Sequence, residues 1–310
     1  MITRYCISDT QKEIIKTILY FDVFNYPLNL DEIYQNSSFS ESKNKFEIEI
    51  NSLIQTECIY KLGNFYSTAN NIKPNVERRL SGNVLAEKML SKANDISKQI
   101  SKFPFVSGVC ISGGLSKNYF DENSDFDFFI ITKPNRLWIC RTLYIILFKT
   151  FSKEKKKLYC LNYFISESDL AINDKNLFVA TELAYLIPTI NHKAYKSLLG
   201  NNLWYKLYFK NKIENREFES QEINDPWYKI LIETIFYGRF GNFIDSTLLN
   251  ITLSRWRQKY PEMSNEDFDL QFRSRKHVCK RHTHGYQNKV LQMYADKIKD
   301  YESKFNINLT

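Results

Sequence analysis

Apolar positions from residue 10 to residue 67 predict three helices followed by a β-hairpin. The first and third helices show apolar residues at the three- and four-residue spacing of a helical face, and the second begins after a capping Asn29. The residues that mark the first and third helices are Ile14, Ile15, Ile18, Leu19, Phe21, Phe46, Ile50, Leu53 and Ile54. Two β-rich runs then meet at Gly63 and Asn64, a pair suited to a two-residue hairpin turn. We assign these elements to a first unit, residues 1–72.

This order of elements resembles a winged helix-turn-helix unit. Some winged helices bind DNA, and others serve as packing or protein-contact modules. The third predicted helix and its approach hold Glu41, Glu47 and Glu49 against Lys43 and Lys45, so on balance they would repel DNA phosphates. We therefore do not expect DNA as a partner, and a DNA-binding regulator stays an alternative hypothesis.

After residue 72 the pattern changes to alternating helices and strands. A polar, helix-rich segment over residues 74–103 leads into apolar runs that predict strands. These runs are FVSGVCISG, DFDFFIIT and KKKLYCLNYFI, with a short helix after the first run and a longer helix over about 135–151 after the second. The alternation predicts a second domain of α/β order over residues 73–172.

From about residue 175 onward the pattern predicts helices only. We assign residues 173–310 to a helical C-terminal domain, with one long helix near residues 226–258 and a last helix near residues 285–304. The apolar residues of the long helix are expected in the core.

Composition is that of an ordinary soluble globular chain with a basic balance. Hydrophobic residues make up 43% and charged residues 25% of the 310 residues. The net charge of +8 suits phosphate-bearing partners such as nucleotides or nucleic acid, although a basic surface without such a partner has the same charge. Six scattered cysteines without a Cys-x-x-Cys pair indicate a reduced, cytoplasmic protein rather than a disulfide framework.

No membrane segment is predicted. The N-terminus has no apolar signal region. The most apolar stretch, Leu137 to Phe148, is too short to span a bilayer and contains Arg141. We interpret it as a buried helix and expect no membrane partner.

The candidate chemistry lies where two predicted strands approach each other in sequence. Asp125 and Asp127 are two residues apart on an extended strand, so their carboxylates are expected on one face. Such a pair can hold Mg²⁺, and without a cation the two charges would repel each other. At the end of the preceding strand, Gly113 and Gly114 lack side chains, so a phosphate can approach the backbone N–H groups closely.

Polar side chains near the glycine pair add to this candidate site. Ser112 or Ser116 could contribute a hydroxyl group, and Lys117 a positive charge. The alternative interpretation is a surface turn rich in Asp, Asn and Ser between two core strands.

The arrangement resembles the nucleotidyltransferase superfamily, which has the polymerase-β-like fold. Its signature is a strand, then Gly followed by Gly or Ser, then about ten residues, then Asp-x-Asp on the next strand. Here the matching residues are Gly113, Gly114, Asp125 and Asp127, and Ser124 also stands in a position familiar from the family. The resemblance implies an α+β fold, with a small mixed-sheet core between the winged-helix-like unit and the helical C-terminal region.

The resemblance also implies an activity. It is the Mg²⁺-dependent transfer of a nucleoside monophosphate from an NTP to an acceptor hydroxyl, with release of pyrophosphate. Asp125 and Asp127 would bind the metal, and Gly113, Gly114 and a nearby serine would hold the β- and γ-phosphates. The acceptor stays open: it is a small molecule, a protein or RNA.

One feature departs from the family pattern. Members usually have a third carboxylate on a later strand, whereas Leu158 to Ile165 contains no Asp or Glu, and Asn162 is its metal-capable side chain. An Asn carbonyl can ligate a cation but cannot accept a proton. Glu167, Asp169 or Glu182 could supply the missing group. An active enzyme and a catalytically weak or inactive nucleotide-binding regulator therefore both stay open.

A basic segment near the C-terminus offers a further candidate. Between Arg273 and His284 the chain holds Arg and Lys residues, three histidines and no acidic residue. The segment could clamp a triphosphate or contact nucleic acid, since cationic side chains stabilise charge on phosphoryl groups. A solvated basic surface is the alternative.

Overall fold

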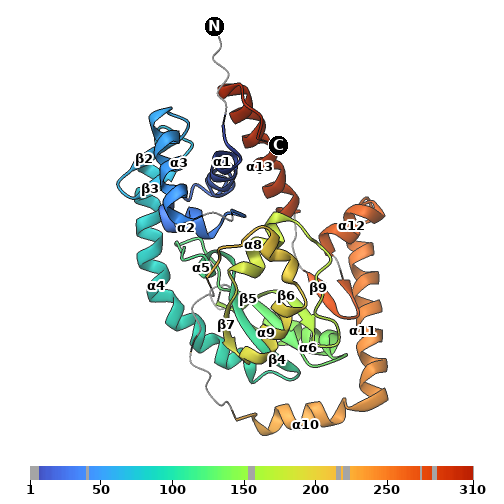
Figure 1. Ribbon diagram of the computed structural model, residues 1–310. Helices are drawn as coiled ribbons and strands as arrows, with labels where there is room; N and C mark the ends of the chain where they lie inside the picture. Colours follow the sequence, from blue (N-terminus) through green and yellow to red (C-terminus); the bar gives the residue numbers. More distant parts are fainter. Residues whose placement is uncertain are drawn as a thin grey trace.

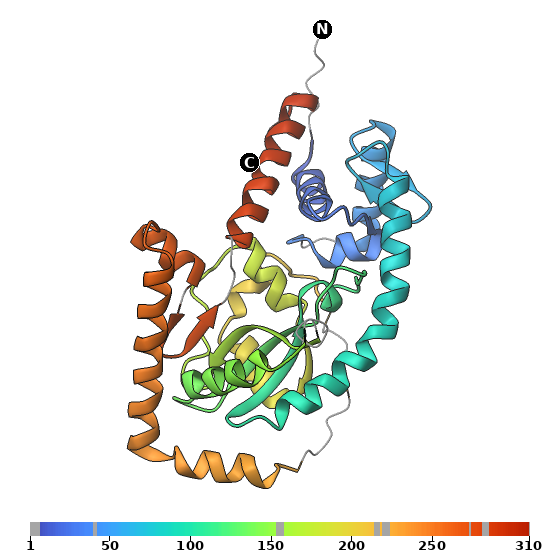
Figure 2. The ribbon, with the colours of Figure 1, turned by 180° about the vertical axis from the view of Figure 1, so that it is seen from behind.

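The computed structural model describes residues 7–39, 42–152, 158–213, 218, 224–272, 274–280 and 285–309. They form a mixed α/β protein around a mixed sheet of strand order β7-β4-β5-β6-β9-β8, with helices over both faces of the sheet (Figures 1 and 2). None of the helices in these ranges combines the length and apolar character needed to cross a membrane.

The N-terminal unit packs helices against a small antiparallel sheet of order β1-β3-β2. Its elements are α1 (Asp9–Asp22), β1 (Leu28–Asn29), α2 (Leu30–Gln35), α3 (Lys43–Gln55), β2 (Tyr60–Leu62) and β3 (Phe65–Ser67). The predicted cap at Asn29 is confirmed, because its side chain accepts a hydrogen bond from the backbone N–H of Glu32. Gly63 has the positive φ of +58° that the predicted hairpin turn requires.

The middle of the chain follows the predicted alternation. Its elements are α4 (Lys73–Ser101), β4 (Val106–Ser112), α5 (Gly113–Ser116), β5 (Asp127–Thr132), α6 (Leu137–Lys149) and β6 (Cys160–Ser166). The helix α4 covers the segment that was expected to be polar and helix-rich over residues 74–103.

The prediction of helices only after residue 175 is wrong, because short strands from this region join the central sheet. The elements are α8 (Leu177–Ala184), β7 (Ile187–Ile190), α9 (His192–Gly200), η1 (Leu203–Leu207), α10 (Trp227–Ile235), α11 (Gly238–Lys259), α12 (Asn265–Phe272), β8 (Ser274–Arg275), β9 (Val278–Lys280) and α13 (Tyr286–Phe305). Strand β7 lies at the sheet edge, where Pro188 is tolerated. The strands were missed because runs of two to four residues give no periodic signal.

The single long helix expected near residues 226–258 is two helices, α10 and α11. Gly238 is the first residue of α11 and has a positive φ of +66°. This left-handed conformation interrupts the helix between α10 and α11. The expectation that their apolar residues lie in the core is also wrong for a large share of them, since Trp227, Tyr237 and Phe243 are 75%, 82% and 68% exposed.

The pairing of β4, β5 and β6 places one end of each strand at the same end of the sheet. Strand β4 is antiparallel to β5, and β5 is parallel to β6. The register pairs Ser112 with Asp127, and Asp127 with Cys160. The end of β4 and the beginnings of β5 and β6 therefore meet, which places the glycine turn after β4 beside the first residue of β5.

The two faces of the sheet belong to two apolar cores. Phe129 and Ile131 of β5 face a core shared with the N-terminal unit, α8 and α13, whereas Phe128 and Ile130 face a core shared with α4 and α6. The predicted burial of this strand on both faces is confirmed. The boundaries at 72/73 and 172/173 stay predictions, since the first core joins residues from all three proposed domains.

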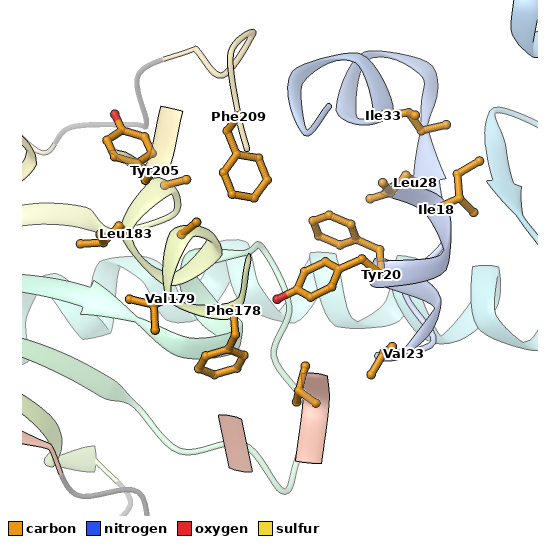
Figure 3. Close-up of a cluster of buried hydrophobic side chains, with 14 of the residues drawn as sticks. Ile18, Tyr20, Val23, Leu28, Ile33, Phe178, Val179, Leu183, Tyr205 and Phe209 are labelled. Carbon is orange, nitrogen blue, oxygen red and sulfur yellow. The ribbon is translucent and has the colours of Figure 1, made fainter. Parts of the chain in front are cut away.

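Figure 3 shows the contact between the N-terminal unit and α8. Tyr20 of α1 extends toward Phe178 and Val179 of α8, with Ile18 and Leu28 behind it. The first unit is thus packed onto the rest of the molecule by apolar burial, which is the largest favourable term in folding.

A buried carboxylate joins α11 to α6. Oδ1 of Asp245 accepts hydrogen bonds from the backbone N–H groups of Trp138 and Ile139, at 2.8 and 2.9 Å, at the N-terminus of α6. Among the described residues, Oδ2 of Asp245 has no hydrogen-bond partner. Burial raises the pKa of Asp245 from 3.8 to about 6.

We predict that Asp245→Asn removes a pH dependence of stability. The raised pKa means that the folded state binds the proton more tightly than the unfolded state, so this group lowers stability as pH rises from about 4 to 6. Asn keeps an oxygen that accepts both N–H bonds and has no charge. The variant should be more stable than wild type at neutral pH, by about 1–3 kcal/mol, with a smaller difference near pH 4. Urea unfolding at both pH values measures this, with the exposed Asp95→Asn as control. An equal effect at both pH values would contradict it.

Candidate functional site

A cavity of about 580 Å³ lies at the end of the sheet where β4, β5 and β6 meet. Its polar lining includes Ser112, Gly113, Gly114, Lys117, Asp127, Asn162 and Glu182. Its apolar wall comes from α1 and α8 and includes Tyr20, Phe21, Phe24, Phe178 and Val179. The volume is in the range of sites that bind small molecules and cofactors.

Gly113 and Asp127 are in close contact. Gly113 has a φ of +67°, a left-handed conformation, and a Cβ at this position would lie 2.2 Å from Oδ2 of Asp127. Gly114 is less constrained, because a Cβ there would meet the carbonyl oxygen of Tyr119 at 3.2 Å. The first glycine is therefore required both by its backbone conformation and by the carboxylate beside it.

Asn162 lies against the same carboxylate from the other side. The pairing of β5 with β6 shifts between Phe128↔Leu161 and Phe129↔Tyr163, so Asn162 is the additional residue of a bulge. Its Nδ2 group donates a hydrogen bond to Oδ1 of Asp127. The sequence-predicted pair of Asp127 and Asn162 is thus brought together.

The environment of Asp127 disfavours its charged form. Burial raises its pKa, and the carboxylates of Glu182 and Asp125 raise it further. The ammonium group of Lys117 and the hydrogen bond from Asn162 act in the opposite direction, and the resulting pKa is about 7. A cation placed at this carboxylate would favour the charged form, so the electrostatics fit a metal ligand.

Lys117 and Ser116 hold the glycine turn. The Nζ group of Lys117 pairs with Oε1 of Glu182 at 2.8 Å and donates to the carbonyl oxygen of Gly113 at 3.1 Å. The hydroxyl of Ser116 donates to the same oxygen at 2.9 Å and is buried. In this conformation both side chains support the turn, and Lys117 alone of the two lines the cavity.

Asp125 and Ser124 differ from their predicted positions. Strand β5 begins at Asp127, so Asp125 precedes the strand and is exposed, outside the described lining of the cavity. It is still near enough to raise the pKa of Asp127. The hydroxyl of Ser124 donates to Oδ1 of Asp121 at 2.8 Å and accepts from its N–H, so it shapes the loop rather than facing the cavity.

Glu167 and Asp169 do not complete the site. They follow the far end of β6, and the length of β5 separates them from Asp127, roughly 17 Å for five strand residues. Glu167 accepts a hydrogen bond from Ser107, and Asp169 pairs with His277 at 3.1 Å. Glu182, from α8, is the candidate third carboxylate that lines the cavity.

A metal ion here would need ligands beyond the protein. Within the described ranges, no group of three or more His, Cys, Asp or Glu side chains is arranged to hold a metal. The donors nearest to this end of the sheet include the Asp127 carboxylate, the Asn162 amide and the Asp125 and Glu182 carboxylates. Mg²⁺ suits such a partial set, since it keeps several waters and takes oxygens from bound phosphates.

Sequence reasoning missed part of the lining. Asp174 lines the cavity and lies 3.6 Å from the buried Nζ group of Lys280, which also donates to Gln287. Arg78 of α4 also lines it and lies over the ring of Tyr119, 4.6 Å from the centroid. The acid-free basic segment gave a signal for Lys280, whereas no pattern distinguished Asp174 or Arg78.

The structure describes only part of the basic segment that was predicted to clamp a triphosphate, residues 273–284. Arg273 and residues 281–284 lie outside the described residues. Arg275 and Lys276 are exposed, and His277 pairs with Asp169 at the other end of the sheet.

Comparison of the chain with protein-family models, with curated proteins and with solved structures gives no match.

We predict that Gly113→Ala lowers the free energy of unfolding more than Gly63→Ala does. Both glycines have positive φ, so each substitution costs about 1–2 kcal/mol of backbone strain. A Cβ at Gly63 meets nothing within 4 Å, whereas at Gly113 it meets both Oδ2 and Cβ of Asp127. The expected loss at Gly113 is about 2–4 kcal/mol. Urea unfolding measures both variants, and equal losses would show that the contact with Asp127 is relieved without cost.

Proposed function

We propose that this chain is a Mg²⁺-dependent nucleotidyltransferase, which moves a nucleoside monophosphate from an NTP to an acceptor hydroxyl and releases pyrophosphate. The observation that supports the proposal is the contact of Asp127 with the bare turn at Gly113, at the polar end of a cavity of about 580 Å³. A half-buried carboxylate beside a glycine turn that lines the cavity is an arrangement that suits a metal-bound triphosphate.

The sheet supports the same class of protein. Strand β4 ends at Ser112, directly before Gly113 and Gly114, its antiparallel neighbour β5 begins with Asp127, and β6 runs parallel to β5. The mixed pairing agrees with the small mixed-sheet core that the resemblance implies. The proposal also includes the winged-helix-like unit over residues 1–72, and the order of α1, β1, α2, α3, β2 and β3 supports it.

The residues divide into binding and proton-transfer roles. Mg²⁺ bound by Asp127 and Asp125 would offset the charge of the triphosphate and polarise the reacting phosphate. The backbone at Gly113 and Gly114 binds the outer phosphates. Glu182 lines the cavity and accepts the proton of the acceptor hydroxyl. The hydroxyl oxygen of the acceptor forms a bond to the α-phosphorus at the same time. The bond from the α-phosphorus to the pyrophosphate oxygen breaks.

The cavity wall favours a small-molecule acceptor over a protein or RNA. Tyr20 and Phe21 of α1 and Phe178 of α8 are buried residues that line the space. An acceptor bound in this cavity would contact these rings. Small ligands fit enclosed, mostly apolar sites of this size.

A catalytically weak nucleotide-binding regulator is the second candidate, and Asn162 favours it. Asn162 takes the place at which a carboxylate would assist proton removal, and it donates a hydrogen bond to Asp127. The two functions differ in one observable result: the regulator binds NTP with Mg²⁺ and releases no pyrophosphate. Incubation with labelled NTPs and Mg²⁺, with and without cell extract, separates them.

We predict that Asp127→Asn and Asp125→Asn each weaken Mg²⁺-dependent NTP binding at least about 100-fold, because each removes a charged metal ligand. The fold should persist, since neutral Asn lowers the cost of burial at position 127. Calorimetric titration with NTP, in the presence of Mg²⁺ or EDTA, measures the effect. Asp169→Asn is the matched control, because the same substitution then lies at the opposite end of the sheet. Wild-type affinity in both site variants would refute the metal role.

We predict that Asn162→Asp makes the chain depend more strongly on Mg²⁺. Without a cation, a second carboxylate beside Asp127 adds repulsion and lowers the unfolding temperature. With Mg²⁺ the same carboxylate adds a charged ligand, so Mg²⁺ binding should tighten by about 10-fold and any transfer activity should be maintained or raised. Thermal unfolding with Mg²⁺ and with EDTA compares variant and wild type. A loss of stability that Mg²⁺ does not restore would place Asn162 outside the metal site.

A further inference from the structure

Helix α10 has its charged residues turned inward and four large apolar residues turned outward, while Ile232 packs against the core. Lys229 is 4% exposed, and its Nζ group donates to the carbonyl oxygen of Ser101 at 2.9 Å. Glu233 accepts from the backbone N–H of Phe105 at 2.7 Å and pairs with Lys133 at 2.5 Å. The outward positions are held by Trp227, Ile230, Leu231 and Ile235, which are 75%, 56%, 50% and 54% exposed. This polarity is the reverse of a surface helix in a globular monomer.

The apolar surface continues onto the connection to α11 and its first turns. Tyr237, Phe240 and Phe243 are 82%, 56% and 68% exposed. The ring of Phe240 stacks on that of Phe236 with 6.0 Å between centroids. We name the outward residues of both helices the outer apolar face: Trp227, Ile230, Leu231, Ile235, Tyr237, Phe240 and Phe243.

The outer apolar face is almost free of charge. All of residues 226–254 are described, and their charged members are Lys229, Glu233, Arg239 and Asp245. Lys229, Glu233 and Asp245 make the inward contacts given above, and Arg239 is exposed. In a chain of net charge +8, this region is where two copies can approach with little like-charge repulsion.

The exposed area matches what a stable pair of subunits requires. Aromatic side chains bury about 150–250 Å² each, so the four aromatic residues of the face, which are 56–82% exposed, offer roughly 550 Å². The three half-exposed aliphatic residues raise the total to on the order of 800 Å². A standard protein interface buries about 800 Å² on each partner. Contiguous apolar patches above about 600 Å² are rare on monomers.

We propose that the outer apolar face binds the same face of a second copy of this chain, giving a two-fold symmetric dimer. In a two-fold symmetric dimer the same patch of each subunit contacts its counterpart on the other subunit. A patch that is almost free of charge does not repel its own copy. A membrane surface fits less well, because interfacial helices have exposed Lys and Arg beside their apolar face. Within residues 226–254 Lys229 is buried, and Arg239 is the one exposed Lys or Arg.

The dimer leaves the candidate site open. Glu233 contacts the chain at Phe105 and Lys133, at the end of β4 and β5 opposite Ser112 and Asp127. Figures 1 and 2 show α10 at the end of the molecule remote from the N-terminal unit, which forms part of the cavity wall. Dimer formation is therefore independent of the proposed nucleotide site.

Sedimentation analysis of the full chain over a range of concentrations tests the proposal. Wild type should sediment as a dimer at micromolar concentration. Ile230→Glu places a charge in the centre of the face and should raise the dissociation constant at least about 30-fold. Ile48→Glu is the matched control, since Ile48 is 69% exposed on α3, and it should leave the dimer unchanged. Phe243→Ser provides a second weakened variant, and circular dichroism checks that all variants fold.

The other outcomes overturn the proposal. A wild-type chain that stays monomeric at tens of micromolar excludes the dimer. A dimer that survives both Ile230→Glu and Phe243→Ser uses another surface. A monomer that sediments with anionic phospholipid vesicles, and loses this binding with Ile230→Glu, identifies the face as a membrane contact.

Discussion

The burial of one carboxylate beside a turn without side chains is the constraint on which the candidate site depends. Asp127 begins a strand that is buried on both faces, and Glu182 and Asp125 add negative charge around it. Lys117 and the Asn162 amide offset part of that charge, yet the pKa still rises to about 7. Folding gains nothing from such a group, because buried charges are costly unless they are paired. Strongly perturbed groups in a cavity are candidates for function for this reason.

The cost of that carboxylate is offset by the packing around it. Alternate residues of β5 enter two different apolar cores, so a slip of the strand by one residue would turn every side chain into the other core. This fixes Asp127 opposite Ser112 and next to Gly113. The N-terminal unit shares one of these cores with α8, the helix that holds Glu182. The position of a candidate proton acceptor therefore depends on residues more than a hundred positions earlier in the chain.

The sequence was sufficient for the part of the site that is local in the chain. The glycine pair, Asp127 and the two strands beside them were predicted from one stretch, and Asn162 from the next apolar run. From the sequence, Glu182 was one of several candidates for the third carboxylate. The length and direction of β6 decide which of these acids lies near Asp127. Asp174 and Lys280 pair across more than a hundred residues, and the strands β7, β8 and β9 are too short for periodicity to reveal.

Helix α10 shows why an apolar pattern predicts a helix but not the face that turns inward. The turn after α4 leaves the carbonyl oxygen of Ser101 and the N–H of Phe105 in the interior, and Phe105 has a left-handed φ of +66°. If the apolar face of α10 were turned inward, these backbone groups would lose Lys229 and Glu233 as partners, and an unpaired buried group costs about 1–3 kcal/mol. The need to satisfy the turn selects the charged face for the interior. The apolar face is consequently left outside, where its area stabilises the molecule only when another surface covers it.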